Sequence, residues 1–99
     1  MAVVFNWDNK KNRWLKKQRN ITYEQIIVAI ESNAIVDILE HPNKDRYPDQ
    51  LLILVNINDY IYAVPTTVEK NEFFLKTIYP SRKYTELYLN SKRSRNYER

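Results

Sequence analysis

The residues best suited to chemistry in this sequence are two adjacent cations near its C-terminal end. Arg82 and Lys83 follow Pro80-Ser81, where an extended segment is expected to give way to a helix. Unpaired amides in the first turn of a helix, together with two cations, would form an anion site. The alternative is that Arg82 and Lys83 belong to an ordinary solvated helix face.

His41 is the only histidine of the chain, and histidine is the side chain that most readily exchanges a proton near neutral pH. It follows an expected strand and begins a polar loop, where functional residues are common. His41 is therefore a candidate acid or base, and the alternative is a loop histidine hydrogen-bonded to the backbone. Lys76 lies between apolar residues of an expected strand, so it points either to an open face or into a cleft. It is a secondary candidate for the same chemistry.

Metal and nucleotide chemistry have little support in this composition. There is no cysteine, and one histidine leaves only carboxylates, whose spacings do not resemble a zinc ligand set. Asp37 and Glu40 stand three apart in an expected strand, so they point to opposite faces and do not pair around magnesium. Glycine is also absent, which excludes glycine-built phosphate loops. We therefore expect no metal and no cofactor.

The net charge of +4 is distributed unevenly along the 99 residues. Residues 9–19 hold six bases and no acid, and residues 81–99 hold six bases and two acids. Residues 20–62 hold two bases against seven acids. Two basic ends around an acidic middle favour a polyanion partner on one face. The alternative is a pair of solvated helix faces.

Cationic and aromatic side chains in three segments could contact RNA. Lys10, Arg13 and Lys17 stand at i, i+3 and i+7, so they share one stripe of an expected helix. That stripe suits positioning of phosphates better than catalysis. Aromatic rings could stack on unpaired bases. The expected RNA-binding residues are Lys10, Arg13, Lys17, Arg19, Lys44, Arg46, Tyr47 and Tyr84.

A small α+β domain must position these residues, and 99 residues suffice for one. We expect a single domain over residues 1–90 and a basic, flexible tail at 91–99. The expected order is β-α-α-β-β-β-β-α, an antiparallel sheet of four to five strands with two N-terminal helices and one C-terminal helix. The apolar runs are far shorter than the roughly 18 residues of a membrane span, and the start of the chain lacks a signal-peptide pattern. We therefore expect a cytoplasmic protein with no membrane contact.

Capping signals set the expected helices. Asp8 or Asn9 can accept hydrogen bonds from the first turn of a helix that runs to about Gln18. Thr22 and Gln25 form a capping-box pattern that begins a second helix. Ser81 is expected to cap the last helix.

Turn signals and apolar runs set the expected strands. Asn33 is expected to end the second helix in a left-handed conformation, and Asn58-Asp59 is expected to form a tight turn. The expected strands cover residues 3–7, 34–40, 51–57, 60–64 and 73–78. Loops are expected over 41–50 and 65–71.

Three motifs stand in an order that resembles a known family. They are Phe5-Asn6-Trp7-Asp8 with Lys10 and Asn12, then Asn20-Ile21-Thr22-Tyr23-Glu24, then Ile78-Tyr79-Pro80-Ser81-Arg82-Lys83. Their order and spacing, which span residues 3–89, resemble the BrnT-type toxins within the broad RelE/ParE-like group of small toxins. That family begins with an aromatic-x-Trp-Asp motif and a basic helix, opens its second helix with Gly-Val-Ser-Phe-Glu, and has Ile-Ser-Ala-Arg-Arg before its last helix.

This resemblance implies a RelE-like fold and the toxin of a bacterial type II toxin–antitoxin system. The implied activity is metal-independent endoribonuclease cleavage of RNA, such as mRNA on the ribosome, which inhibits growth or translation. The implied partner is an antitoxin encoded beside the toxin, with a ribbon-helix-helix DNA-binding part. Arg82, Lys83 and Lys76 would stabilise the pentavalent phosphorane, and His41 would be the acid or base.

One departure from the family bears on the chemistry. Arg19 stands where the family has a histidine, and an arginine can supply charge but cannot act as a neutral base. The alternative function is therefore a non-catalytic module that binds nucleic acid or a protein through the same basic faces.

Overall fold

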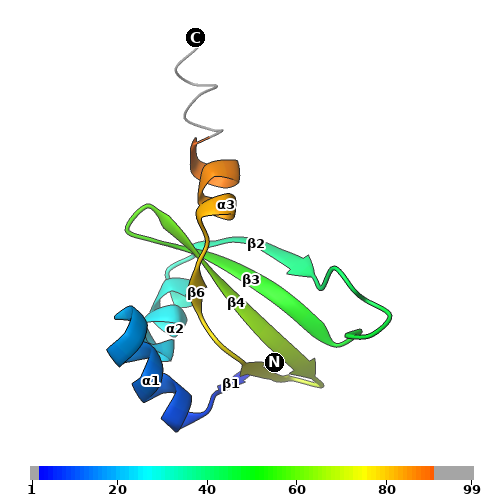
Figure 1. The fold of residues 1–99 in the computed structure, drawn as a ribbon. Helices are drawn as coiled ribbons and strands as arrows, with labels where there is room; N and C mark the ends of the chain where they lie inside the picture. The colour runs from blue at the N-terminus through cyan, green and yellow to red at the C-terminus, as the bar shows by residue number, and fades with distance from the viewer. Residues whose placement is uncertain (1–2, 91–99) are drawn as a thin grey trace.

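The computed structural model describes residues 3–90, which form six strands and three helical segments (Figure 1). In chain order these are β1 (Val4–Asn6), α1 (Asn9–Arg19), α2 (Tyr23–Glu31), β2 (Ile35–Glu40), β3 (Gln50–Ile57), β4 (Tyr60–Glu69), β5 (Glu72–Leu75), β6 (Tyr79–Pro80), α3 (Arg82–Thr85) and the π-helical continuation η1 (Glu86–Asn90). The tail expected at 91–99 lies outside the described residues. None of the helices in the described range is long and apolar enough to cross a membrane.

The first helix begins and ends at local signals. Asp8 caps α1 by accepting a hydrogen bond of 2.8 Å from the Lys10 amide, as expected. The helix runs one residue past Gln18, and Asn20 ends it at a φ of 54°. Asparagine tolerates this left-handed conformation better than most residues, which matters in a chain without glycine.

The second helix confirms the capping-box prediction. The Gln25 amide donates to the Thr22 hydroxyl, and the Gln25 side chain accepts from the Thr22 amide at 2.9 Å. Tyr23 and Ile26 lie on the face of α2 that packs on the sheet, and both are fully buried. Asn33 then turns the chain at a φ of 63°, so its predicted left-handed stop is confirmed.

The sheet is mixed, so the prediction of an antiparallel sheet was wrong in one pairing. The strand order is β1-β5-β4-β3-β2, and β6 also pairs with β4. β1 pairs with β5 in parallel, with Phe5 opposite Phe73. Parallel strands need a long connection, and here α1, α2 and three strands lie between the two partners. The remaining pairs are antiparallel.

The loop expected over 65–71 was wrong, because β4 continues through Pro65 to Glu69. The Pro65 carbonyl accepts a hydrogen bond of 2.8 Å from the Lys76 amide, so this edge of the residue faces the segment between β5 and β6. Proline lacks an N–H group to donate. The Pro65 nitrogen lies on the side of β4 that has no paired strand at this point, between the end of β5 and the start of β6. The expected strand over 73–78 ends early, at Leu75, and the separate strand β6 follows at Tyr79–Pro80.

The β3–β4 hairpin confirms the predicted tight turn and sets the faces of the sheet. Asn58 and Asp59 have φ values of 55° and 64°, as a two-residue hairpin turn requires. The resulting register pairs Ile53 with Val64 on one face and Leu54 with Ala63 on the other.

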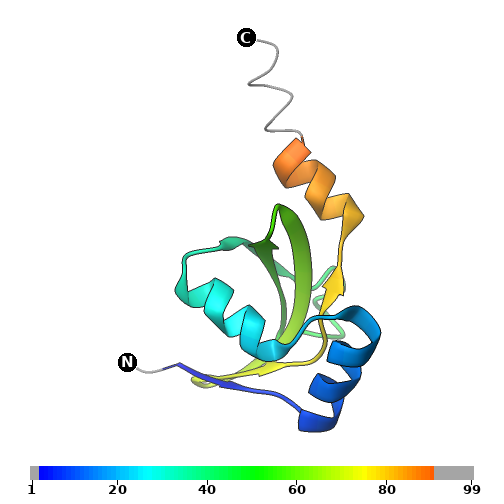
Figure 2. The ribbon, with the colours of Figure 1, turned by 90° about the vertical axis from the view of Figure 1, so that its left-hand side faces the viewer.

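Two clusters of apolar side chains fill the two sides of the sheet. The larger lies under α1 and α2 and contains Leu15, Ile21, Tyr23, Ile26, Ala29, Ile53, Val55, Val64, Leu75 and Ile78. The smaller contains Leu54, Ile61 and Ala63 and is partly covered by Tyr84, Tyr88 and Leu89. Figure 2 shows α2 and the β6–α3 segment on opposite sides of β3 and β4. We call the side that carries Leu52, Leu54, Ala63, Pro65 and Thr67 the open face, because the C-terminal helix covers only part of it.

Tyr23 generates a prediction about stability. It is fully buried and stacks on Trp7 with ring centroids 5.4 Å apart, yet within the described part of the chain its hydroxyl has no hydrogen-bond partner. Burial, with a smaller contribution from Asp8, raises the pKa of Tyr23 to about 12. An unfolded tyrosine loses its proton near pH 10. Between pH 10 and about 12 the unfolded state loses the Tyr23 proton while the folded state keeps it. The ionisation of Tyr23 therefore leaves the free energy of unfolding unchanged below pH 10 and lowers it as the pH rises to about 12.

We expect Tyr23→Phe to increase the free energy of unfolding at pH 7 by about 1 kcal/mol, because it removes an unsatisfied hydroxyl and keeps the ring. The variant should also lose less stability than the unmodified protein between pH 10 and 12. Urea unfolding followed by tryptophan fluorescence measures both quantities. A destabilised Tyr23→Phe, or an unchanged loss at high pH, would contradict this account.

Candidate functional site

A cavity of about 290 Å³ opens on the open face, between the sheet and the C-terminal helix. We call it the central cavity. Its walls are formed by His41, Pro42, Gln50, Leu51, Leu52, Pro65, Tyr79 and Tyr84. It thus brings the predicted residues His41 and Tyr84 together from distant parts of the sequence.

Hydrogen bonds to β4 hold the C-terminal helix above this cavity. The Thr85 hydroxyl accepts from the Ile61 amide at 2.9 Å and donates to the Ser81 carbonyl at 2.7 Å. The Tyr88 hydroxyl donates to Asp37 at 2.6 Å, and this bond is the main reason that the pKa of Tyr88 is raised. Because β2 and β4 both anchor the helix, the position of Tyr84 over the sheet is fixed from two sides.

His41 lies at the rim where β2 ends. Its ring packs against Tyr47, with the centroids 4.4 Å apart, and its Nδ1 accepts a hydrogen bond of 2.9 Å from the Asn43 amide. An imidazole whose Nδ1 accepts carries its proton on Nε2 when it is neutral. As positioned here, neutral His41 is therefore a hydrogen-bond donor toward a ligand, and its one basic nitrogen, Nδ1, is occupied.

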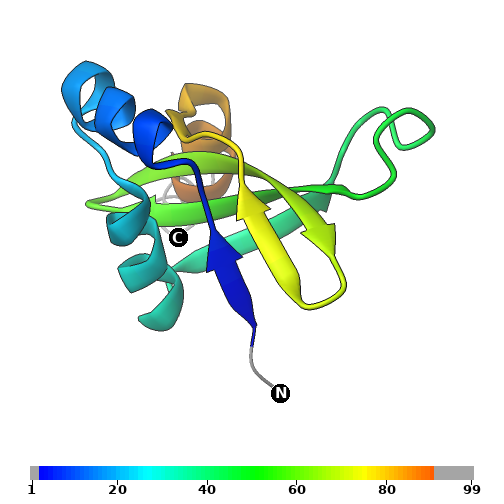
Figure 3. The same cartoon turned by 90° about the horizontal axis from the view of Figure 1, so that it is seen from below.

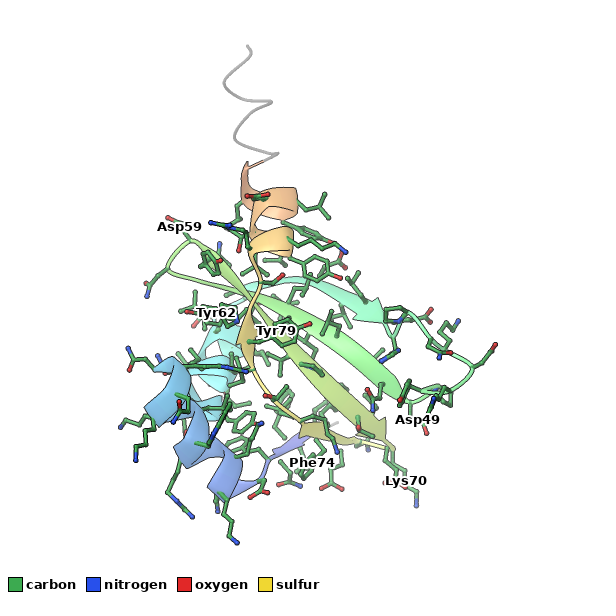
Figure 4. All side chains as sticks on the ribbon, viewed as in Figure 1. Asp49, Asp59, Tyr62, Lys70, Phe74 and Tyr79 are labelled. Atoms are coloured by element: carbon green, nitrogen blue, oxygen red, sulfur yellow. The ribbon has the colours of Figure 1, made fainter. Side chains whose placement is uncertain are left out.

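Two tyrosines supply further donors to the central cavity. Burial, with a contribution from Tyr84, raises the pKa of Tyr79, so its hydroxyl remains protonated at neutral pH. Figure 4 shows Tyr79 near the centre of the sheet. Lys83 lies above the Tyr84 ring, with its Nζ 5.5 Å from the centroid, so a cation adjoins this wall of the cavity.

The anion site expected at the start of the last helix is not supported by this geometry. Ser81 caps the helix as predicted, and its hydroxyl already accepts from the Tyr84 amide at 3.1 Å. The α-helical part is only four residues long. Arg82 and Lys83 are both exposed, and neither lines the central cavity. Their contribution is positive charge near the site.

Lys76 points to the open face, which was one of the two predicted orientations. It lines a second hollow of about 310 Å³ together with Thr67, Glu69, Glu72 and Phe74. Its Nζ lies 5.3 Å from the centroid of the Phe74 ring. We call this second hollow the lower hollow.

The remaining predicted cations lie at two ends of the molecule. Seen from below in Figure 3, α1 and α2 lie at one end of the sheet and the loop between β2 and β3 lies at the other. Lys10, Arg13 and Lys17 are exposed on α1. In the loop, Arg46 lies 5.7 Å from the Tyr47 ring centroid, and Lys44 pairs with Glu40 at 3.1 Å. The structure therefore does not gather all the predicted RNA-binding residues into one patch.

Arg19 has a structural contact that its sequence position did not reveal. Its Nη1 donates to the Ile78 carbonyl at 2.6 Å, and its guanidinium lies 5.0 Å from the centroid of the Trp14 ring. These contacts tie the end of α1 to the segment before β6. The charge of Arg19 is still exposed and available to a polyanion.

The sequence interpretation missed three residues of the open face: Gln50, Phe74 and Tyr79. Phe74 and Tyr79 fell within or beside an expected strand, but assigning residues 65–71 to a loop removed the register that places them. Alternation along β4 through Pro65, Thr67 and Glu69 was the signal that could have found this face.

Comparisons with known proteins identify no relative. No protein-family model, curated protein or solved structure matches the chain. Within residues 3–90, no three His, Cys, Asp or Glu side chains are grouped so as to hold a metal ion. The function must therefore be argued from the geometry of the open face.

The hydrogen bond to His41 generates a prediction that spectroscopy can check without assignment ambiguity, since the chain has one histidine. We expect the neutral ring to be the tautomer protonated at Nε2, because Nδ1 accepts from the Asn43 amide. Long-range proton–nitrogen correlation spectra above pH 8 distinguish the tautomers by their nitrogen shifts. Spectra showing a proton on Nδ1 would refute the arrangement described for this rim.

Proposed function

We propose that the protein is the toxin of a bacterial type II toxin–antitoxin system, BrnT-like and RelE-like, and that it is a metal-independent endoribonuclease acting on RNA such as mRNA. The observation that carries this proposal is the central cavity. It joins His41 to Tyr79 and Tyr84 on a face flanked by cations. Aromatic walls, a hydrogen-bond donor on His41 and neighbouring cations suit this face to binding RNA.

The proposed reaction is internal transesterification of the RNA backbone. The 2′-hydroxyl passes its proton to a water molecule as it attacks the adjacent phosphorus, the bond to the 5′-oxygen breaks, and that oxygen takes up a proton from an acid of the protein. Tyr79 or Tyr84 donates the proton to the leaving oxygen and is reprotonated from water. His41 donates it through Nε2 only as the doubly protonated ring, which requires Nδ1 to release the Asn43 amide. Lys76 stabilises the added negative charge of the phosphorane, and Arg82 and Lys83 add positive potential from outside the cavity lining.

The exposed bases of α1 support a role in attracting the substrate. The helix carries six bases and no acid, and only Leu15 is buried within it. Such a helix raises the local concentration of a polyanion through its field, without reading sequence. Lys44, Arg46 and Tyr47 would contact the same strand from the opposite end of the molecule.

The same charge distribution supports the proposed antitoxin. An acidic protein encoded beside this chain would neutralise α1 and the Arg82-Lys83 pair and thereby cover the approaches to the central cavity. In this proposal the antitoxin carries a ribbon-helix-helix DNA-binding part, and both proteins act in the cytoplasm.

A non-catalytic RNA-binding module is the second candidate, and one observation favours it. Nδ1 of His41 is occupied by the Asn43 amide and Nε2 carries the proton of the neutral ring, so the only histidine offers no free basic nitrogen. Arg82 and Lys83 also lie outside the lining of the central cavity. A protein of this kind would bind RNA through the same face without turnover.

We expect purified protein to cleave RNA in the presence of EDTA and to leave 2′,3′-cyclic phosphate ends. His41→Ala should reduce the rate by roughly 10²-fold or more, the scale of one lost acid–base contribution. Arg82→Ala should reduce it by a smaller factor, because Arg82 is exposed and lies outside the cavity lining. Lys70→Asn, at the tip of the β4–β5 turn where φ is 57°, is the control that removes a charge elsewhere. Gel analysis of end-labelled RNA, with and without ribosomes, measures the rates.

Three results would count against the enzyme. They are an absolute requirement for magnesium, cleavage that is unchanged in both variants, and binding without any turnover in either arm. The last result, together with the absence of growth arrest on expression, would establish the non-catalytic module instead.

A further inference from the structure

The open face carries its two hollows side by side along β4. Pro65 lines the central cavity, and Thr67, two residues further on, lines the lower hollow. Residues two apart in a strand point to the same face and are separated by about 7 Å. That step is comparable to the one between successive nucleotides of an extended single strand.

Lys76 lies at the junction between the hollows. Its amide donates to the Pro65 carbonyl at 2.8 Å, while its side chain lines the lower hollow over Phe74. A cation at this point suits the phosphate that would link two nucleotides seated on either side.

Each hollow offers an aromatic ring to a base. The central cavity has Tyr79 and Tyr84 in its walls, and the lower hollow has Phe74, whose side chain is 36% exposed. Figure 4 places Phe74 below Tyr79, toward the turn where Lys70 lies. A phenylalanine at the surface of a sheet, beside a lysine, is a stacking platform that tolerates any base.

The carboxylates of the lower hollow distinguish a base from a phosphate. Glu69 and Glu72 stand opposite each other in the register, and the Asn6 amide group donates to Glu72. Two carboxylates repel a phosphate but accept hydrogen bonds from the amino groups of a base edge. The lower hollow is therefore better suited to a base than to the backbone.

We propose that the open face binds two successive unpaired nucleotides of RNA, with one base in the central cavity, the next on Phe74, and the linking phosphate on Lys76. This inference rests on the proposed function for its ligand and adds that the substrate is single-stranded at this point. Paired bases cannot separate to enter two hollows, so a duplex is excluded.

The test measures binding of a fluorescent 2′-O-methyl hexanucleotide, which cannot be cleaved, by anisotropy. We expect the single strand to bind at least tenfold more tightly than its duplex. Phe74→Ala should weaken binding about tenfold, within the range measured for loss of one stacked base, and Phe74→Tyr should restore it. Lys76→Ala should reduce the slope of log affinity against log salt by about 0.7, the value for one phosphate contact on a single strand.

Lys70→Asn, at the turn of the same hairpin, removes a charge that lines neither hollow and should change affinity less than Phe74→Ala does. An abasic position in the hexanucleotide should make Phe74→Ala silent when the missing base is the one that Phe74 stacks on. Circular dichroism confirms that each variant is folded.

Full binding by Phe74→Ala, equal binding of the duplex, or no binding by the unmodified protein would each overturn the proposal. The two proposals fail separately. Uncleavable RNA that binds as described, while cleavable RNA stays intact, removes the endoribonuclease and keeps the nucleotide sites. Cleavage of RNA, together with unchanged binding by Phe74→Ala and Lys76→Ala, removes the nucleotide sites and keeps the endoribonuclease.

Discussion

The register of the β3–β4 hairpin is the constraint on which the two faces of this sheet depend. A shift by one residue would move Leu54 and Ala63 to the helix-covered side and expose Ile53 and Val64. The turn that prevents this uses positive φ at two consecutive positions, and the chain has no glycine to provide it. Asparagine and aspartate are the residues that can. By fixing the register, that turn decides which residues of β3 and β4 line the hollows of the open face.

Pro65 makes the open face accessible. It ends the regular pairing between β4 and β5, so the chain leaves the sheet at Lys76 and rejoins it as β6. Because β4 has one partner before this interruption and another after it, the C-terminal helix is carried toward the β3–β4 turn. The lower half of β4 is left uncovered as a result. Proline usually ends a strand. Pro65 instead divides β4 into a part covered by the C-terminal helix and an accessible part.

The features that the sequence predicted correctly are those decided within a few residues. The Asp8 cap, the Thr22 and Gln25 capping box and the Asn58-Asp59 turn each depend on local hydrogen bonds or backbone preference. The parallel pairing of β1 with β5 does not depend on local signals, because the three residues of β1 pair with residues far along the chain. Nor could the sequence show which side of β4 the Pro65 nitrogen faces. The same holds for the candidate site. His41 and Lys76 were identified from the sequence, whereas Phe74 and Tyr79 could be placed only once the pairing of β4 with β5 and β6 was known.

The separation between α1 and the loop after β2 (Figure 3) has a physical consequence for how charge is used. Screening in physiological salt limits the reach of an exposed charge to about 8 Å. The bases of α1 lie across the molecule from the loop after β2 (Figure 3), so they act on an approaching polyanion rather than on a phosphate held beside His41. Contacts near the cavity must then come from Lys76, Lys83 and Arg46, which each lie over an aromatic ring. A cation held over a ring is restricted in orientation, and this favours a defined position for the strand over general attraction.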